Sequence, residues 1–385
     1  GMSAVARYLR KIGLQVFGYD KTSTTLTNSL INEGIEINFV DEANAIPQIL
    51  LKNKEDVLWV YTPAIPKNSQ QKCYLEELNL QLFKRSEILE LITQRSICLA
   101  VAGTHGKTTT STYLAHILKS NNINFSAFLG GISSNYNTNY IEHSTGLELF
   151  DKPIIIIEAD EFDRSFHRLN PQAAIITSVD ADHLDIYTNT EEFIKAFQVF
   201  AEKVRNNSDS IAPTGLIIND IIDVFNESIH STWYYGNNTE SAYVLSDLHV
   251  KNNKFHFTLT HNTTHIEYTN GLPGIHNSLN AVAAISLCNE ILKLEPQALA
   301  GAIASFKGVK RRFEIIYETK ERVIIDDYAH HPSELKSFID SVKLLYPNRK
   351  ITGVFQPHLY TRTRDFEKGF IDELTKLDEL ILMEI

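Results

Sequence analysis

The sequence has few of the residues that build disulfide frameworks, cysteine metal clusters or membrane spans. Its 385 residues include three cysteines, Cys73, Cys98 and Cys288, which are scattered and form no C-x-x-C pair. This pattern excludes a disulfide-stapled fold and a cysteine zinc site, and it indicates a reducing compartment. No apolar run approaches the roughly 18 residues of a membrane span, and the N-terminus lacks a secretory pattern. We therefore expect a cytoplasmic protein without membrane insertion.

Positive charge is also scarce. The 36 lysines and arginines are outnumbered by 47 acidic residues, which gives a net charge of −11. This balance argues against a general nucleic-acid binder, although local sites can still bind phosphates. The 43% hydrophobic and 22% charged residues are typical of a globular protein. The length predicts two or three domains, and no internal repeats or low-complexity tracts interrupt them.

The hydrophobic pattern divides the chain into three α/β units, at residues 1–95, 96–310 and 311–385. The first opens with helical spacing over 3–12 and a strand-like run over 14–19. That is half of a βαβ unit whose first strand is missing. Gly1 could be the last glycine of a glycine-rich turn, or a residue left by a tag.

The two later units are predicted from the same alternation of strands and helices. Short alternating strands between 232 and 268 predict a small antiparallel sheet inside the second unit, before a helix over 277–293. The third unit is expected to be incomplete. Its predicted elements are strands near 323–327, 351–355 and 379–383 and a helix that starts at His331.

The sharpest local motif is Gly103-Thr104-His105-Gly106-Lys107-Thr108-Thr109. It lies between a predicted buried strand over 97–101 and a predicted helix, which is the setting of a phosphate-binding loop. Lys107 would reach the phosphates of a nucleotide, and the Thr108 hydroxyl would bind Mg²⁺. Val101 occupies the first glycine position of the general motif. The alternative is a glycine turn with a surface lysine.

Two further strands end in polar clusters. The run 154–157 leads into Glu158, and the run 174–179 leads toward His183. Because ligands gather at the carboxyl ends of parallel strands, these side chains and Thr108 are expected at one edge. They suit Mg²⁺ held largely by phosphates and water. The alternatives are a helix-capping carboxylate for Glu158 and a solvated loop histidine for His183.

Polar residues also gather near the later elements. His276 and Asn280 open a helix, where amides can cap the helix or read a base edge, and for their neighbour Asn277 we favour capping. Arg312 lies at the junction of the second and third units, where it could hold a phosphate or simply be solvated. Two more clusters follow predicted strands of the third unit, and their candidate residues are Asp327, Tyr328, His330, His358 and Arg362.

Taken together, these motifs resemble the Mur ligases of peptidoglycan synthesis, and within them the alanine-adding members. The segments that carry the resemblance are 1–4, 103–109, 158–166, 180–187, 274–280, 311–314, 326–332 and 355–363. The resemblance implies a Rossmann-like UDP-binding domain, a central ATPase domain with a parallel sheet and a small antiparallel sheet, and a Rossmann-like C-terminal domain. It also implies a ligase that joins L-alanine to UDP-N-acetylmuramate through an acyl phosphate, with ATP as co-substrate and two Mg²⁺ ions.

The resemblance also implies roles for individual residues. The catalytic set would be Lys107, Glu158, His183 and Arg312, and the metal ligands Thr108, Glu158 and His183. The ATP site would comprise Gly103, Thr104, His105, Gly106, Lys107, Thr108, Thr109, His276, Asn280, Arg312 and Asp327. The amino-acid site would comprise Tyr328, His330, His358 and Arg362, and the UDP-sugar site Gly1, Ser3, His105 and Ser165.

Three alternatives stay open at this point. The chain could be a related ligase that attaches a recycled tripeptide to UDP-N-acetylmuramate, or a folylpolyglutamate synthase. It could also be a non-catalytic nucleotide-binding relative, although intact Lys107, Glu158 and His183 speak against that. We expect a monomer or a homodimer.

Overall fold

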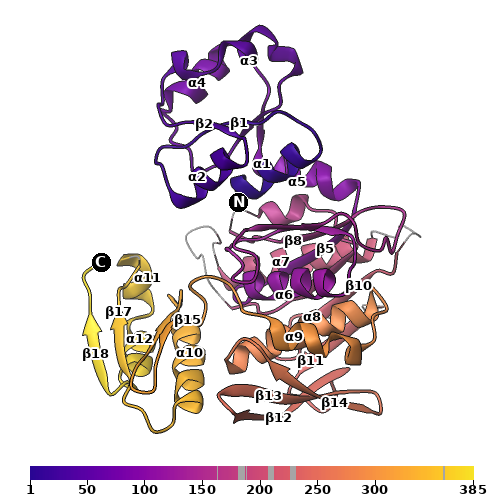
Figure 1. Cartoon of the computed structure of the whole chain (residues 1–385), viewed down its shortest axis with the longest axis vertical. Helices are drawn as coiled ribbons and strands as arrows, with labels where there is room; N and C mark the ends of the chain where they lie inside the picture. Colours follow the sequence, from indigo (N-terminus) through magenta and orange to yellow (C-terminus); the bar gives the residue numbers. More distant parts are fainter. Residues whose placement is uncertain (163, 181–186, 188, 207–211, 226–230, 359) are drawn as a thin grey trace.

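The computed structural model describes the whole chain except residues 163, 181–186, 188, 207–211, 226–230 and 359. Three units follow one another along the chain, and the central one is the largest (Figure 1). The N-terminal unit packs on the central unit through α1 and α5, and the C-terminal unit lies beside the central unit. Within the described part of the chain, no helix combines the length and apolar character needed to cross a membrane.

The N-terminal unit contains two small parallel sheets, in which β1 pairs with β2 and β3 with β4. The predicted helix over 3–12 is confirmed as α1. The elements are α1 (Met2–Lys11), β1 (Phe17–Tyr19), α2 (Thr25–Asn32), β2 (Glu36–Asn38), η1 (Ala43–Ala45), α3 (Gln48–Lys52), η2 (Lys54–Asp56), β3 (Trp59–Tyr61), α4 (Gln70–Glu77), β4 (Leu82–Lys84) and α5 (Arg85–Gln94).

The central unit is built on one ten-stranded sheet of order β14-β13-β12-β11-β10-β9-β5-β8-β6-β7. The strands from β6 to β12 in this order pair in parallel, and β7, β13 and β14 pair antiparallel. The predicted antiparallel strands therefore continue the edge of the main sheet. The strands are β5 (Ile97–Ala102), β6 (Phe125–Phe128), β7 (Tyr140–His143), β8 (Ile154–Glu158), β9 (Ala173–Ile176), β10 (Gly215–Asn219), β11 (Thr232–Gly236), β12 (Tyr243–Lys251), β13 (Lys254–His261) and β14 (Thr264–Asn270).

Both faces of this sheet are covered by helices, which explains why its central strands are apolar throughout. Leu99 and Val101 of β5 face one apolar cluster, and Cys98 and Ala100 face the other. The first cluster includes α6, α8 and α9, and the second includes α7 together with α1 and α5 of the N-terminal unit. The helical elements of this unit are α6 (Lys107–Ser120), η3 (Ser165–Arg168), α7 (Thr190–Asn206), α8 (Ile275–Glu290), η4 (Pro296–Leu299) and α9 (Ala300–Ser305).

The three strands predicted for the C-terminal unit and its helix after His331 are confirmed. His331 caps α10 by accepting a hydrogen bond from the Ser333 N–H at 3.4 Å, and Pro332 fits the first turn because that position needs no donor. The structure adds a fourth strand, β15, and the four strands form two pairs. β15 pairs with β16 antiparallel, and β17 pairs with β18 parallel. The elements are β15 (Glu314–Glu318), β16 (Val323–Asp326), α10 (Pro332–Leu345), β17 (Thr352–Phe355), α11 (Tyr360–Asp365), α12 (Glu367–Leu374) and β18 (Glu379–Leu382).

Candidate active site

The phosphate-loop motif forms the turn between β5 and α6, and two of its glycines are required by geometry. Gly103 has φ +135°, and a Cβ there would lie 2.1 Å from the Thr177 hydroxyl oxygen. Gly106 has φ +81°, and a Cβ there would lie 2.7 Å from the Asn280 side-chain oxygen. Both positions therefore favour glycine for two reasons: the backbone has a positive φ, and a Cβ atom would clash with a neighbouring side chain. The turn presents the first N–H groups of α6, which have no acceptor within the helix.

The end of β9 braces the loop. The predicted strand over 174–179 is shorter in the structure, because β9 ends at Ile176. Thr177 and Ser178 bond the loop instead of extending the strand: the Ser178 hydroxyl accepts from the His105 N–H at 2.9 Å, and the Thr177 hydroxyl donates to the His105 carbonyl. These bonds fix the backbone of the loop at His105.

Lys107 lies over the loop and is paired with a buried carboxylate. Its Nζ is 2.5 Å from the Gly103 carbonyl oxygen and 2.9 Å from Oε1 of Glu161. The Glu161 side chain is 1% exposed. Burial raises the pKa of Glu161 to about 7, although the Lys107 ammonium opposes this rise. The Lys107 cation therefore compensates a costly buried charge and is positioned beside the loop.

Thr108 is the point where three predicted site residues meet. Its hydroxyl donates to Oε1 of Glu158 at 2.8 Å, and an Arg312 N–H approaches the same hydroxyl at 3.4 Å. The second Glu158 oxygen accepts from the Gly130 N–H at 2.8 Å. The carboxylate therefore lies beside the loop rather than capping a helix, and it is fixed from two sides. A hydroxyl and a carboxylate are hard oxygen donors of the kind that Mg²⁺ prefers.

His276 and Asn280 reach the site from the first turns of α8. Burial lowers the pKa of His276 to about 4, so its imidazole is neutral. Its Nδ1 is buried and has no hydrogen-bond partner within the described residues. The expectation that Asn277 caps the helix is wrong: the N-cap is Gly274, and the Asn277 amide donates to the Pro273 carbonyl at 2.6 Å. An unsatisfied buried acceptor or donor beside the loop is suited to a ligand.

The His105 side chain connects the loop to the C-terminal unit. Its Nδ1 is 3.0 Å from Oε1 of Glu334, and its Nε2 is 3.2 Å from the Ser333 hydroxyl oxygen. Both partners belong to the first turn of α10. Hydrogen bonding to His105 holds the pKa of Glu334 well below its usual range despite burial. The C-terminal unit therefore contacts the phosphate loop directly.

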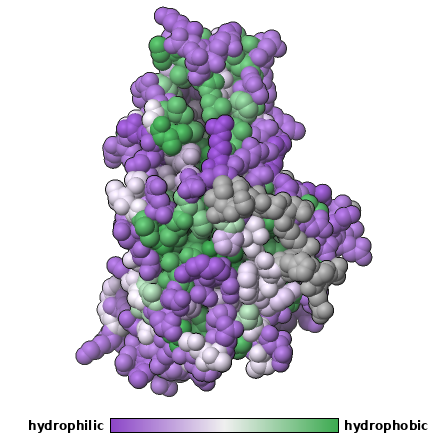
Figure 2. Space-filling view, turned by 90° about the vertical axis from the view of Figure 1, so that its right-hand side faces the viewer, coloured by the Kyte–Doolittle hydropathy of each residue, from purple (hydrophilic) through white to green (hydrophobic). Residues whose placement is uncertain are grey.

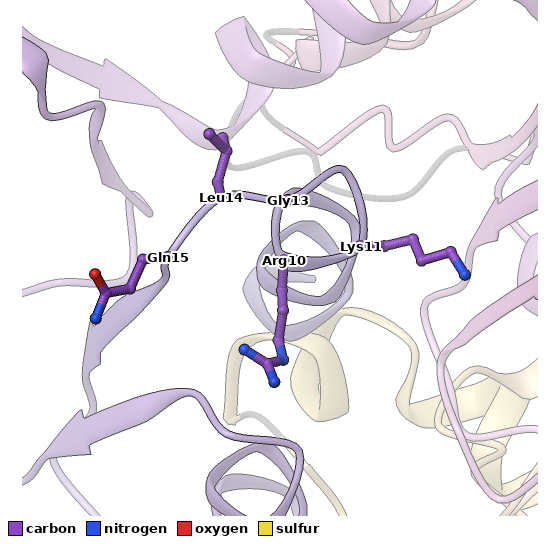
Figure 3. Close-up of a pocket in the computed structure, with 5 residues that line it drawn as sticks. All are labelled: Arg10, Lys11, Gly13, Leu14 and Gln15. Atoms are coloured by element: carbon purple, nitrogen blue, oxygen red, sulfur yellow. The ribbon is translucent and has the colours of Figure 1, made fainter.

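Two pockets differ in what they offer. A small one between the N-terminal and central units is lined by Arg85, Ser86, Leu89, Glu158, Asp160, Ser165, Phe166 and Leu169. Its lining includes the Arg85 guanidinium and the carboxylates of Glu158 and Asp160. The other is open and lies at the end of α1, where the side chains of Arg10 and Lys11 point in different directions (Figure 3). The small pocket is the one linked to the phosphate loop, because Glu158 in its lining contacts Thr108.

Comparison with known proteins identifies this arrangement. Three family models match in succession: "Mur ligase family, catalytic domain" over residues 1–96, "Mur ligase middle domain" over 101–288, and "Mur ligase, glutamate ligase domain" over 311–384. The chain belongs to the Mur ligase family. The matched ranges follow the three predicted units closely, and the domain limits at 95 and 310 remain our proposal.

Similar proteins are found over the full chain. Curated proteins named UDP-N-acetylmuramate--L-alanine ligase from Christiangramia forsetii and Flavobacterium psychrophilum are 43% and 42% identical, covering 100% of this chain and 81% of each relative. A crystal structure of UDP-N-acetylmuramate-alanine ligase from Thermotoga maritima superposes with a TM-score of 0.80 at 28% identity, covering 100% of this chain and 88% of that one. The fold predicted for the three units is therefore confirmed.

Three of the four candidate amino-acid residues of this Mur ligase lie together in the C-terminal unit. The Tyr328 and His330 rings are 5.0 Å apart, and the His330 and His358 rings are 6.2 Å apart. Arg362 is half-buried in α11, the helix that follows His358. Asp327, predicted for the ribose, accepts hydrogen bonds from the N–H groups of Phe313 and Ala329 at 2.7 and 2.8 Å. Those contacts lie within the C-terminal unit, close to its junction with the central unit, and a ribose contact stays a prediction.

The structure brings two of the residues predicted for the UDP-sugar to Arg85 and places a third, Ser3, elsewhere. Gly1 lies against the Arg85 guanidinium, and Ser165 lines the pocket that Arg85 shares with Glu158. The Ser3 hydroxyl instead accepts from the Asn139 amide at 2.9 Å in a buried position, so its observed contact is structural. His183, predicted as a metal ligand, lies outside the described residues.

Sequence reasoning missed three residues that the structure places at the site: Glu161, Glu334 and Arg85. Glu161 lies three residues after Glu158 in the same acidic run. The sequence does not indicate which carboxylate of this run contacts Lys107. Glu334 lies 229 residues from its partner His105. Its position three residues after His331 is typical of a helix first turn, and this pattern suggests a cap rather than a contact with another unit.

Nucleotide binding is expected to cause proton uptake at Glu161. When phosphates attract Lys107, the buried carboxylate loses the charge that holds its pKa down, so its pKa rises above about 7 and part of the population protonates. Calorimetry of Mg-nucleotide binding near about pH 8, in buffers of different ionisation enthalpy, measures this uptake. Glu161→Gln should bind without it. Equal proton uptake in both proteins would contradict the Lys107–Glu161 coupling.

Proposed function

We propose that this Mur ligase joins L-alanine to the carboxylate of UDP-N-acetylmuramate at the expense of ATP, in peptidoglycan precursor synthesis. The observation that supports it most is the convergence of Glu158 and Arg312 on the Thr108 hydroxyl, next to Lys107. Names of relatives about 40% identical over the full chain support alanine as the amino acid.

The chemistry explains why these residue types are needed. A carboxylate is a poor electrophile, so transfer of the γ-phosphoryl group of ATP converts it into an acyl phosphate. The amine of L-alanine then attacks the acyl carbon, and phosphate leaves from the tetrahedral intermediate. Because charge accumulates on the transferring phosphoryl oxygens, the task of the protein is positioning and charge neutralisation.

Each part of the site has a role in this scheme. Lys107 and the N–H groups of the loop would hold the β- and γ-phosphates. Arg312, which approaches the Thr108 hydroxyl from the junction with the C-terminal unit, would contact the same phosphates. Thr108 and Glu158 would hold Mg²⁺, which supplies charge neutralisation when bound. A second Mg²⁺ at His183 is part of the proposal. Neutral His276, together with Asn280, would contact adenine.

The amino acid is assigned to the C-terminal unit. Tyr328, His330, His358 and Arg362 come from the ends of β16 and β17 and from α11. The contact of His105 with Glu334 and Ser333 brings α10 of the same unit to the phosphate loop. Closure of this unit on the loop would protect the acyl phosphate from water. The shared pocket at Arg85 and Glu158 is where the UDP-sugar carboxylate would approach.

Phosphate release with different amino acids tests the function. The full chain is supplied with ATP, Mg²⁺ and UDP-N-acetylmuramate, and L-alanine, a murein tripeptide and L-glutamate are compared. We expect phosphate release to depend on L-alanine. Tripeptide-dependent release would indicate the recycling ligase, glutamate-dependent release without UDP-N-acetylmuramate would indicate a folylpolyglutamate-type ligase, and no release with any of them would indicate a binding module.

Replacement of Arg362 is expected to weaken L-alanine specifically. Arg362→Ala removes a cation suited to the amino-acid carboxylate, so the KM for L-alanine should rise by about 10-fold or more. The KM for UDP-N-acetylmuramate should stay within about twofold, because the other two units make most of that site. Arg364→Ala is the matched control, since Arg364 lies on the same helix and is exposed beside Asp365. A selective loss of UDP-sugar affinity in Arg362→Ala would place the amino-acid site elsewhere.

A further inference from the structure

The far edge of the large sheet carries a polar cluster that the ligase reaction does not use. Strands β12, β13 and β14 alternate in burial, with Phe255, Phe257 and Tyr268 in the core. The opposite face of the same strands is open to solvent and carries histidines, threonines and an acidic residue. On this face His249, His256 and Glu267 each offer one ligand atom, and these atoms all lie within 4.8 Å of one another.

A β-bulge brings the two histidines together. Ser246 pairs with Thr258, and regular pairing from there would place Leu248 opposite His256. Instead the register shifts by one residue, and His249 pairs directly with His256. Asp247, at the bulge, has φ +51°. Because side chains of directly opposed residues leave a sheet on the same face, the extra residue replaces a leucine by a histidine next to His256.

The contacts of the His249 ring prepare it to bind a cation. Its Nδ1 is 2.7 Å from the Asp247 carbonyl oxygen, which can only accept, so Nδ1 carries the proton in the neutral ring. The Nε2 lone pair is thereby directed outward. Metal-binding histidines have this arrangement, in which the second nitrogen donates to a carbonyl or carboxylate. The bulge therefore both aligns the ring and fixes its tautomer.

His256 and Glu267 complete the set. The His256 side chain is 15% exposed, its ring stacks on His249 with centroids 5.3 Å apart, and its Nδ1 lies 3.8 Å from Oε1 of Glu267. The Thr269 hydroxyl is 3.2 Å from the same nitrogen, and this contact gives way if Nδ1 is the atom that binds the ion. Ligand atoms around a tetrahedral ion lie about 3.3 Å apart, so small side-chain rotations bring the three atoms to this spacing.

We propose that His249, His256 and Glu267 form a site for a divalent transition-metal ion such as Zn²⁺. Two imidazoles and one carboxylate favour zinc, nickel or copper over Mg²⁺, which prefers oxygen ligands. Three protein ligands leave a fourth position for water. The site bridges three adjacent strands, so a bound ion clamps the edge of the sheet at the bulge.

This site is remote from the phosphate loop. Strand β13 is separated from β5 by β12, β11, β10 and β9. At about 4.8 Å per strand, five spacings place the two about 24 Å apart across the sheet. The ion is therefore expected to bind independently of nucleotide and to stabilise the edge rather than take part in the reaction.

Metal binding to the full chain tests the proposal. Calorimetric titration with Zn²⁺ is carried out in excess Mg²⁺, which occupies oxygen-rich sites. We expect the wild-type protein to bind one more equivalent of Zn²⁺ than His256→Ala. With Co²⁺ as a spectroscopic probe, the ligand-field absorption should be lost in His249→Ala. In Glu267→Gln the affinity for Co²⁺ should fall by about 10-fold or more.

The matched control is His265→Ala. His265 lies on the same solvent face of β14 and pairs with Thr260, but it is not among the three clustered ligands. It should keep the Zn²⁺ equivalent and the Co²⁺ absorption. The proposal is overturned if wild type and His256→Ala bind Zn²⁺ with the same stoichiometry and affinity, or if His265→Ala loses as much as His256→Ala. Circular dichroism establishes that each variant is folded.

Discussion

Lys107→Ala is expected to lower the kcat of L-alanine-dependent phosphate release by about 10³-fold or more. The Lys107 ammonium lies on the Gly103 carbonyl at the mouth of the loop, where the β- and γ-phosphates are proposed to bind. Charge develops on the γ-phosphoryl oxygens in the transition state, and a preorganised cation there costs no reorganisation. The effect should therefore fall on kcat as well as on ATP binding. Lys119→Ala, on the outer end of the same helix, should retain activity.

The design must separate lost chemistry from lost stability. Removing Lys107 leaves Glu161 buried without the cation that opposes its desolvation, which is costly by itself. The double variant Lys107→Ala/Glu161→Gln removes that carboxylate charge as well. We expect the double variant to recover thermal stability relative to Lys107→Ala while staying inactive. If activity returns with stability, or if a folded Lys107→Ala turns over normally, the phosphate-loop assignment is wrong.

The phosphate loop could be predicted from sequence because its determinants are local. Glycines at 103 and 106 with Lys107 and Thr108 form one continuous run, and the apolar strand before it fixes its place in a parallel sheet. Glu158 followed from the rule that parallel strands end at the same edge, and the structure brings it to 2.8 Å from Thr108. Patterns of this kind depend on a few neighbouring residues, so one sequence is enough.

Contacts between residues far apart in the sequence could not be predicted in this way. The sequence resemblance places His105 in the ATP and UDP-sugar sites. In the structure both of its ring nitrogens contact α10 of the C-terminal unit. The pairing of Lys107 with Glu161 rather than Asp160 depends on where the chain turns after β8, over one or two residues. The contact between Asp327 and the Phe313 N–H likewise joins the two residues that flank the β15–β16 pair. Hydrophobic periodicity carries no information about side-chain contacts of this kind.

Glu158→Gln is expected to raise the Mg²⁺ concentration needed for half-maximal activity by about 10- to 100-fold. The substitution preserves size and leaves an oxygen that can accept from the Gly130 N–H or the Thr108 hydroxyl, but it removes the negative charge. Mg²⁺ prefers charged oxygen ligands, so affinity should fall while the loop keeps its shape. In Glu158→Gln, Arg312 should contribute more to phosphate binding relative to the metal than in the wild type, because the negative charge of Glu158 is gone.

Initial rates measured against Mg²⁺ at saturating ATP, UDP-N-acetylmuramate and L-alanine give the half-maximal concentration directly. If the only loss is metal affinity, high Mg²⁺ should restore most of kcat in Glu158→Gln. It should restore none in Lys107→Ala, because Mg²⁺ from solution cannot take the position of the deleted ammonium group. Glu142→Gln is the control for removing a negative charge, since Glu142 lies on β7 in an ion pair with Lys11. An unchanged Mg²⁺ requirement in Glu158→Gln, with a normal maximal rate, would mean that the Thr108–Glu158 pair only supports the loop and that the ion is held by other groups.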